Sequence, residues 1–137
     1  ALQYPLLPVR QQALSALLDR AAEPEFGPAP AVNTAEGLRV LAYAEIEYLE
    51  CTHHIVHFHL LSGEDVTSLS LRVPFSAVAG PLLADGRFLQ PHRSYVVSLA
   101  AVRLLSAGEL QMTSGARVPI PRGREGAVRE AIRAWYR

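Results

Sequence analysis

Short apolar segments separated by turn-forming residues occupy most of the chain after residue 37, and they constrain the fold more than any other feature. Val56, Phe58 and Leu60 fall on one face of an extended segment, whereas His57 and His59 fall on the other. Turns rich in glycine and serine separate such segments. The expected strands are residues 38–43, 46–51, 55–61, 66–71, 94–97, 102–105, 109–113 and 116–120. This pattern predicts a mainly β chain and is ordinarily typical of a barrel or a sandwich.

Three other segments have the spacing of amphipathic helices. Pro74 suits the first turn of a short helix, which ends at Asp85 and Gly86. A second helix closes the chain from about Arg124, and a third occupies residues 10–22. The apolar positions are Leu14, Leu17, Leu18 and Ala21 in the helix at residues 10–22. They are Phe75, Val78, Ala79, Leu82 and Leu83 in the helix after Pro74, and Val128, Ile132 and Trp135 in the closing helix.

The formal net charge is zero, but the charges are unevenly distributed. Residues 1–86 hold four arginines and ten acidic residues, a sum of −6, whereas residues 87–137 hold nine arginines and three glutamates, a sum of +6. Such a basic half is typical of a surface that faces a polyanion. A solvated helix face accounts for the arginines after residue 123, but less readily for those between residues 93 and 122. The neutral total favours a localised patch over indiscriminate nucleic-acid binding.

The composition is that of an ordinary globular domain, with 50% hydrophobic and 19% charged residues. No apolar run approaches the ~18–20 residues of a membrane span, and no signal-peptide pattern stands at the start. The single Cys51 has no partner for an intramolecular disulfide. These features predict a cytoplasmic location and no membrane contact.

Two arginines stand at the ends of expected strands. His92, Arg93 and Ser94 form a polar head directly before a β-branched run, and Arg122 follows an apolar strand that ends in prolines. Proline cannot donate in a sheet ladder, so it marks strand ends or edges. Loops on a β scaffold present their side chains outward. Two arginines in such places, with no acidic neighbour in the sequence, indicate an anion-binding surface rather than a catalytic site. DNA is the anion that we expect.

The same segments resemble the LytTR family of bacterial DNA-binding output domains. The resemblance covers roughly residues 36–137 and rests on three blocks: Ile46-Glu47-Tyr48-Leu49-Glu50, Phe88-Leu89-Gln90-Pro91-His92-Arg93-Ser94-Tyr95-Val96-Val97 and Val118-Pro119-Ile120-Pro121-Arg122. It implies an elongated, mainly β domain of small stacked antiparallel sheets with short helices. It also implies sequence-specific binding of duplex DNA at promoter repeats by a transcription regulator, the output half of a two-component response regulator, without a cofactor.

The resemblance further implies roles for individual residues. Arg93 and Arg122 match positions that enter successive major grooves, and a guanidinium binds guanine bidentately or clamps phosphate. His54 matches a polar position that reaches a base, and a neutral imidazole both donates and accepts hydrogen bonds. Backbone or supporting contacts are expected from Arg72, His92, Ser94, Arg117 and Arg124. Two structural alternatives stay open: Ser94 caps a turn, and each arginine pairs with a surface carboxylate.

The sequence departs from the family pattern at four positions. Gln90 and Pro91 replace a commonly basic and apolar pair, Ser98 replaces an asparagine, and Pro121 replaces a serine. The loss of a basic residue at position 90 is expected to weaken backbone binding or to alter the preferred DNA site.

The expected domain organisation has three parts. Residues 1–22 resemble the last strand and helix of a receiver domain, with Leu7 in place of its lysine, although an unrelated N-terminal helix is the alternative. Residues 23–35 contain prolines and little apolar patterning, so they predict a semi-rigid linker. Residues 36–137 form the DNA-binding domain. An upstream receiver in the full-length protein is the implied partner, and a homodimer on DNA is left open.

Four histidines between residues 53 and 59 raise a different hypothesis, a metal-binding β module. His57 and His59 share a strand face, as a His-x-His pair does. No HExxH motif or cysteine pair accompanies them, so polar residues on a solvated face are the favoured interpretation. A protein-interaction domain derived from a DNA-binding one is the remaining alternative. No phosphate-binding loop or paired carboxylates support an enzyme.

Overall fold

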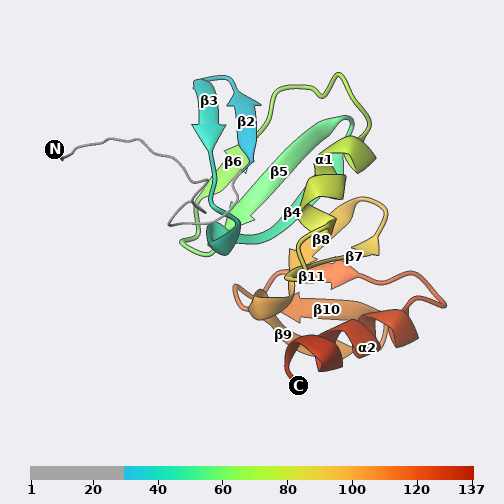
Figure 1. Ribbon diagram of the computed structural model, residues 1–137. Coiled ribbons are helices and arrows are strands. Elements are labelled where there is room, and N and C mark those ends of the chain that lie inside the picture. Colours follow the sequence, from blue (N-terminus) through green and yellow to red (C-terminus); the bar gives the residue numbers. More distant parts are fainter. Residues whose placement is uncertain (1–29) are drawn as a thin grey trace, which may run out of the picture.

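Three antiparallel sheets and two α-helices make up residues 30–137, the part of the chain that the computed structural model describes (Figure 1). They form an elongated, mainly β structure of small sheets, which confirms the predicted fold class. The expected N-terminal helix at residues 10–22 lies outside the described residues. Within residues 30–137, no helix is long and apolar enough to cross a membrane.

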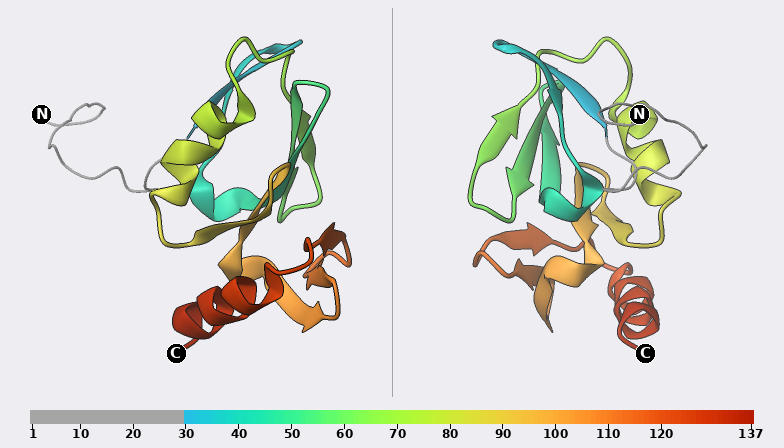
Figure 2. Two further views of the ribbon diagram at one scale, coloured as in Figure 1. Left: turned by 90° about the vertical axis from the view of Figure 1, so that its right-hand side faces the viewer. Right: turned by 60° about the vertical axis from the view of Figure 1, so that its left-hand side comes forward.

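The largest sheet has five strands in the order β6-β5-β4-β8-β7. Its strands are β4 (Ile46–Thr52), β5 (Ile55–Leu60), β6 (Asp65–Thr67), β7 (Phe88–His92) and β8 (Tyr95–Ser98). The alternation predicted for β5 is confirmed, because its apolar residues are buried and its histidines are half-buried. Helix α1 (Phe75–Leu83) buries Ala79 and Leu82, and a first apolar core lies between this helix and the sheet (Figure 2).

A second sheet has three strands in the order β11-β10-β9. Its strands are β9 (Val102–Ser106), β10 (Glu109–Met112) and β11 (Arg117–Pro119), and a short 3-10 helix, η2 (Leu99–Ala101), leads into it. Helix α2 (Glu125–Trp135) buries Val128 in a second core that contains Leu110 and Met112. Val96 and Val97 of β8 belong to opposite cores, since successive side chains of a strand point to opposite faces. The five-stranded sheet therefore contributes one face to each core.

The buried carboxylate of Glu47 joins the two sheets. Glu47 lies in β4 and is only 2% exposed. Its Oε2 accepts hydrogen bonds from the backbone N–H of Ser114 at 2.9 Å and from the hydroxyl of Thr113 at 3.3 Å, both in the β10–β11 turn. A buried carboxylate without such donors carries a large desolvation cost. Glu47 therefore ties the turn of the small sheet to the large one.

Strands β2 (Ala31–Thr34) and β3 (Gly37–Val40) form a separate two-stranded ribbon. Residues 31–34 were expected in the linker, and the prediction is wrong for these residues because Val32 is buried in the first core. One apolar residue in a short segment gives too little periodicity to indicate a strand. The Thr34 hydroxyl donates to the Gly37 carbonyl at 2.7 Å and closes the turn.

Two expected strands end three or more residues before their predicted last residue. The strand expected over residues 38–43 ends at Val40, and a 3-10 helix, η1 (Tyr43–Glu45), follows. Tyr43 turns into the core, where its ring meets that of Phe88 edge-on at a centroid distance of 5.3 Å. The strand expected over residues 66–71 ends at Thr67, because the chain then leaves the sheet and the N–H of Leu71 donates to the carbonyl of His54 at 2.7 Å.

Strand β7 was not among the expected strands. Pro91 stands inside it, and a proline normally argues against a strand because it has no N–H to donate. Here the pairing between β7 and β8 shifts its register between Leu89 and His92, so the irregularity accommodates the proline. This segment is therefore the end of a β-hairpin rather than the start of a single strand, and its residues are His92, Arg93, Ser94 and Tyr95.

Candidate nucleic-acid interface

Two hairpin turns lie side by side at one end of the strands of the five-stranded sheet. We refer to this end of the sheet as the edge. The β4–β5 turn consists of His53 and His54, and the β7–β8 turn consists of Arg93 and Ser94. Strands β4 and β8 are neighbours, and the N–H of Cys51 donates to the carbonyl of Ser94 at 2.8 Å. Paired strands lie about 4.8 Å apart, so the two turns are presented side by side. Both lie on the right-hand side of Figure 1, and the left view of Figure 2 looks onto this edge.

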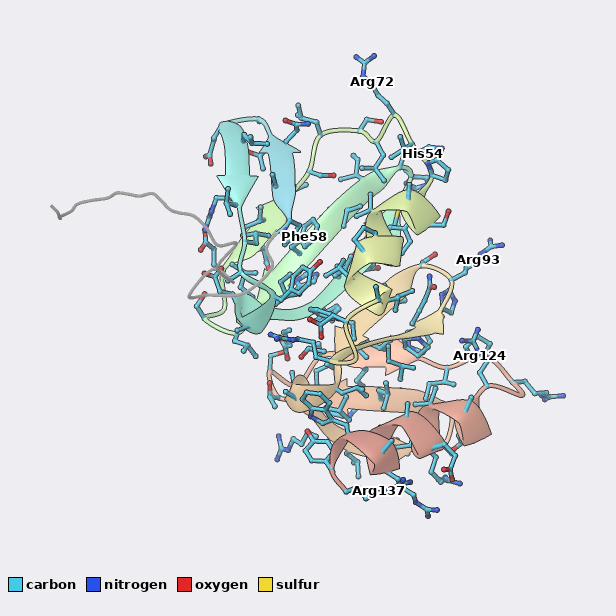
Figure 3. All side chains as sticks on the ribbon, in the orientation of Figure 1. His54, Phe58, Arg72, Arg93, Arg124 and Arg137 are labelled. Atoms are coloured by element: carbon cyan, nitrogen blue, oxygen red, sulfur yellow. The ribbon has the colours of Figure 1, made fainter. Side chains whose placement is uncertain are left out.

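The β4–β5 turn has an unusual backbone. Both His53 and His54 have positive φ values, 50° and 66°, which a two-residue type I′ hairpin turn requires. Asparagine and glycine ordinarily occupy these positions, because the left-handed region is strained for larger residues. The sheet nevertheless holds two exposed imidazoles there. In Figure 3, Arg72 points outward from the loop before α1, and the hydrogen bond from the N–H of Leu71 to the carbonyl of His54 ties this loop to the turn.

The β7–β8 turn presents an exposed arginine on a fixed backbone. The N–H of Ser94 donates to Nδ1 of His92 at 3.0 Å, so Nδ1 is the acceptor of a neutral imidazole and Nε2 carries the hydrogen. The side-chain amide of Gln90 donates to the carbonyl of Arg93 at 3.2 Å. Both bonds fix the turn and leave the guanidinium of Arg93 exposed. His92 therefore supports the turn and keeps an N–H to donate.

A third turn connects β11 to α2 and carries two more arginines. The N–H of Arg124 donates to the carbonyl of Pro121 at 3.1 Å, with Gly123 at φ +91°. That arrangement fits a type II turn, which favours glycine at its third position. Arg122 occupies the second position and is exposed. The guanidinium of Arg124 donates to the carbonyl of Gln90 at 2.8 Å and thereby joins this turn to β7.

The arginines of this edge differ from most others in the described part of the chain. Arg72, Arg93, Arg122 and Arg124 form no ion pair with any carboxylate of residues 30–137. In the same part of the chain, five other arginines are paired with carboxylates: Arg39, Arg87, Arg117, Arg129 and Arg133. The edge is therefore a cationic surface whose guanidinium charges no carboxylate of residues 30–137 pairs with, the chemistry that binds phosphate and guanine.

Seven of the eight site residues predicted from the sequence belong to these turns and their flanks. They are His54, Arg72, His92, Ser94, Arg93, Arg122 and Arg124. Arg117 does not join them, because it starts β11 at the end opposite the third turn and pairs with Glu109 at 3.2 Å. Sequence reasoning missed His53 as the other half of its turn. It also missed Gln90 as the residue that contacts both Arg93 and Arg124, although position 90 already stood out as a departure from the family pattern.

Two tyrosines lie on β4 and β8, the neighbouring strands that lead to the hairpin turns. The hydroxyl of Tyr95 donates to Glu50 at 3.1 Å, across neighbouring strands, and its ring lies edge-on to His92 at 5.5 Å. Burial raises the pKa of Tyr95, and the bond to Glu50 raises it further. Burial, followed by the negative charge of Glu50, raises the pKa of Tyr48 to about 12. Both phenols therefore stay protonated at neutral pH, and Tyr95 remains a donor.

The histidine cluster does not converge on a common point. His59 Nδ1 lies 2.7 Å from Asp65, and its ring stacks on Tyr48 at 4.3 Å. His57 faces Thr67 instead, at 3.5 Å. Among the described residues, no group of three or more histidine, cysteine or acidic side chains is placed to hold a metal ion. The structure therefore offers the metal-binding hypothesis no ligand set within residues 30–137.

Comparisons with known proteins agree with this geometry. The family model of the LytTr DNA-binding domain matches residues 36–133. Among solved structures, the LytTr DNA-binding domain of a Bacillus cereus protein is similar, with a TM-score of 0.60 and 18% identity, over 76% of this chain and 95% of that chain. At that identity the likeness concerns the fold alone. No sequence among the curated proteins matches the chain significantly.

Proposed function

The chain belongs to the LytTR family of DNA-binding domains, and we propose that it regulates transcription by binding specific duplex sites through the edge formed by its three turns. The observation that carries the proposal is that four arginines without an ion pair in residues 30–137 and the exposed turn of His53 and His54, with its positive φ angles, lie on that edge. Most contacts of DNA-binding proteins go to phosphates and position the protein, whereas contacts to base edges provide specificity. An edge with several separate turns is able to do both.

Arg93, Arg122 and His54 are the proposed base contacts. A guanidinium binds O6 and N7 of guanine bidentately in the major groove, and an imidazole donates to or accepts from a base edge. Arg72, Arg124, His92 and Ser94 contact phosphates or hold the turns in place. Arg117 is left out of the interface, since its charge is paired with Glu109 on the small sheet.

The regulatory setting is proposed from the family and from the similar solved domain. That Bacillus cereus domain is named as part of a DNA response regulator. We propose that this chain is likewise the output half of a two-component regulator in the cytoplasm, with an upstream receiver domain whose last strand and helix are residues 1–22. Two copies would bind promoter repeats.

Acetyl phosphate should leave the duplex affinity of the 137-residue chain unchanged, and a change would contradict the assignment of the phosphorylation site to a separate receiver.

Selection of binding sites from a pool of random duplexes tests the proposed function. The chain should enrich a short motif, and it should bind the enriched duplex at least roughly a thousandfold more tightly than a scrambled one at physiological salt. Arg39→Ala serves as a control, because Arg39 pairs with Glu64 away from the three turns. Enrichment of no motif, or equal affinity for scrambled DNA, would contradict sequence-specific binding.

A further inference from the structure

A groove between strand β9 and helix α2 is not part of the proposed DNA edge. It encloses about 470 Å³, and its lining includes Arg103, Leu104, Arg129, Ile132, Arg133 and Tyr136. The α2 residues recur at a spacing of three or four, so they share one face of the helix. The lining residues of the helix, from Arg129 to Tyr136, lie five to twelve residues beyond Arg124, about 8 to 18 Å along a helix at 1.5 Å per residue. In Figure 3, Arg72 and Arg137 mark opposite ends of the molecule.

One wall of the groove is a free strand edge. Strand β9 is the last strand of the three-stranded sheet and, within the described residues, pairs with β10 alone. An edge strand presents unpaired N–H and C=O groups along its open side. A groove between an edge strand and a helix is the arrangement in which an extended peptide adds to a sheet, with main-chain bonds on one side and side-chain pockets on the other.

The side chains of the groove indicate the chemistry of its occupant. Leu104 and Tyr136 are 52% and 56% exposed, which gives the groove an apolar component. Three arginines line it, and no carboxylate is among its lining residues in the described part of the chain. Arg129 and Arg133 contact glutamates of their own helix only at 3.6 and 3.8 Å, and exposed pairs of this kind are weak.

We propose that this groove binds an extended, acidic segment of a partner protein as a fourth strand beside β9. This goes beyond DNA binding, since it assigns a second surface to a protein partner. A second copy of the chain fits poorly, because pairing two β9 strands would bring the arginine-lined groove of one copy against that of the other. A DNA backbone also fits poorly, because it would leave the exposed Leu104 and Tyr136 without apolar contacts.

The probe is a fluorescent seven-residue peptide of alternating glutamate and valine, added to the whole 137-residue chain. We expect saturable binding in fluorescence anisotropy, with the NMR amide shifts of residues 102–106 changing most. A peptide with lysine in place of glutamate should bind at least roughly tenfold more weakly, because it meets like charges. A glutamate peptide N-methylated at every residue should also bind weakly, because it lacks backbone donors on both edges and cannot donate to the strand.

Variants separate this surface from the DNA edge. Arg103→Glu and Arg133→Glu are exposed changes on different elements, and either should weaken peptide binding while leaving duplex affinity nearly intact. Arg93→Ala should have the reverse effect. The proposal is overturned if the lysine or N-methylated peptide binds as well as the glutamate peptide. It is also overturned if both glutamate variants weaken duplex binding and leave peptide binding unchanged, since the arginines would then serve DNA.

Discussion

Arg124 and Gln90, separated by 34 positions in the chain, are joined by a hydrogen bond of 2.8 Å from the guanidinium of Arg124 to the backbone carbonyl of Gln90. The amide of Gln90 in turn donates to the carbonyl of Arg93. One residue of β7 thus contacts the turn that carries Arg93 and the turn that carries Arg122. The relative placement of the two arginines depends on this connection between the large and the small sheet.

Replacement of Arg124 by alanine tests that connection. The exposed bond should contribute no more than ~1 kcal/mol to the free energy of unfolding, measured in urea. Duplex affinity should fall further than stability, because the third turn loses its attachment to β7 and a phosphate contact is lost. The loss should be similar for the preferred and for a scrambled duplex. A change of base preference at one cluster of positions would instead identify Arg124 as a base contact.

Arg93→Ala and Arg122→Ala should each relax base preference at a different short cluster of base pairs. A lost arginine–guanine pair costs about 1–3 kcal/mol against the preferred site and much less against random DNA. Site selection with each variant, followed by comparison of the enriched motifs, measures the effect. Arg117→Ala is the matched control, since Arg117 is exposed but paired with Glu109. If both variants weaken all sequences equally, the two arginines are phosphate clamps, and specificity has to come from His54 or DNA shape.

Several elements of this interface could be predicted from the sequence, and others could not. The prolines and turn residues of the sequence predicted that Arg93 and Arg122 lie at strand ends, and in the structure both lie in turns. Strand β7 escaped prediction because Pro91 opposes a strand locally and only the register shift of the sheet tolerates it. The bond between Arg124 and Gln90 depends on the packing of two sheets, and local spacing carries no information about it.

Because His54 has a positive φ, we expect substitutions at this position to change stability and duplex affinity in opposite directions. His54→Gly should raise the free energy of unfolding by about 1 kcal/mol, because glycine adopts positive φ without the strain of a side chain. The same change should lower affinity for the preferred duplex, since it removes the imidazole. His54→Asn should fall between the two, because asparagine tolerates this conformation and retains hydrogen-bonding groups. Urea unfolding and duplex titration measure the two effects; unchanged duplex affinity in His54→Gly would remove His54 from the interface.

Glu47→Ala should destabilise the chain by about 1–3 kcal/mol, because it removes the charged acceptor of the partly buried hydrogen bond from the N–H of Ser114. Glu47→Gln should cost less, since its amide oxygen still accepts that bond. Denaturant unfolding measures both values. If Glu47→Ala has the same free energy of unfolding as the unaltered chain, Glu47 does not join the sheets, because the loss of a stabilising hydrogen-bond acceptor would lower that free energy.

The salt dependence of duplex binding tests the central account most directly. Each phosphate neutralised by an arginine contributes about 0.9 to the slope of log affinity against log salt concentration. We predict a steep linear decrease for the unaltered chain on its selected duplex. An Arg72→Ala/Arg124→Ala double variant should reduce that slope by about 2, whereas Arg39→Ala should leave it unchanged. A flat salt dependence, or a slope that the double variant leaves unaltered, would contradict the binding of DNA through this edge.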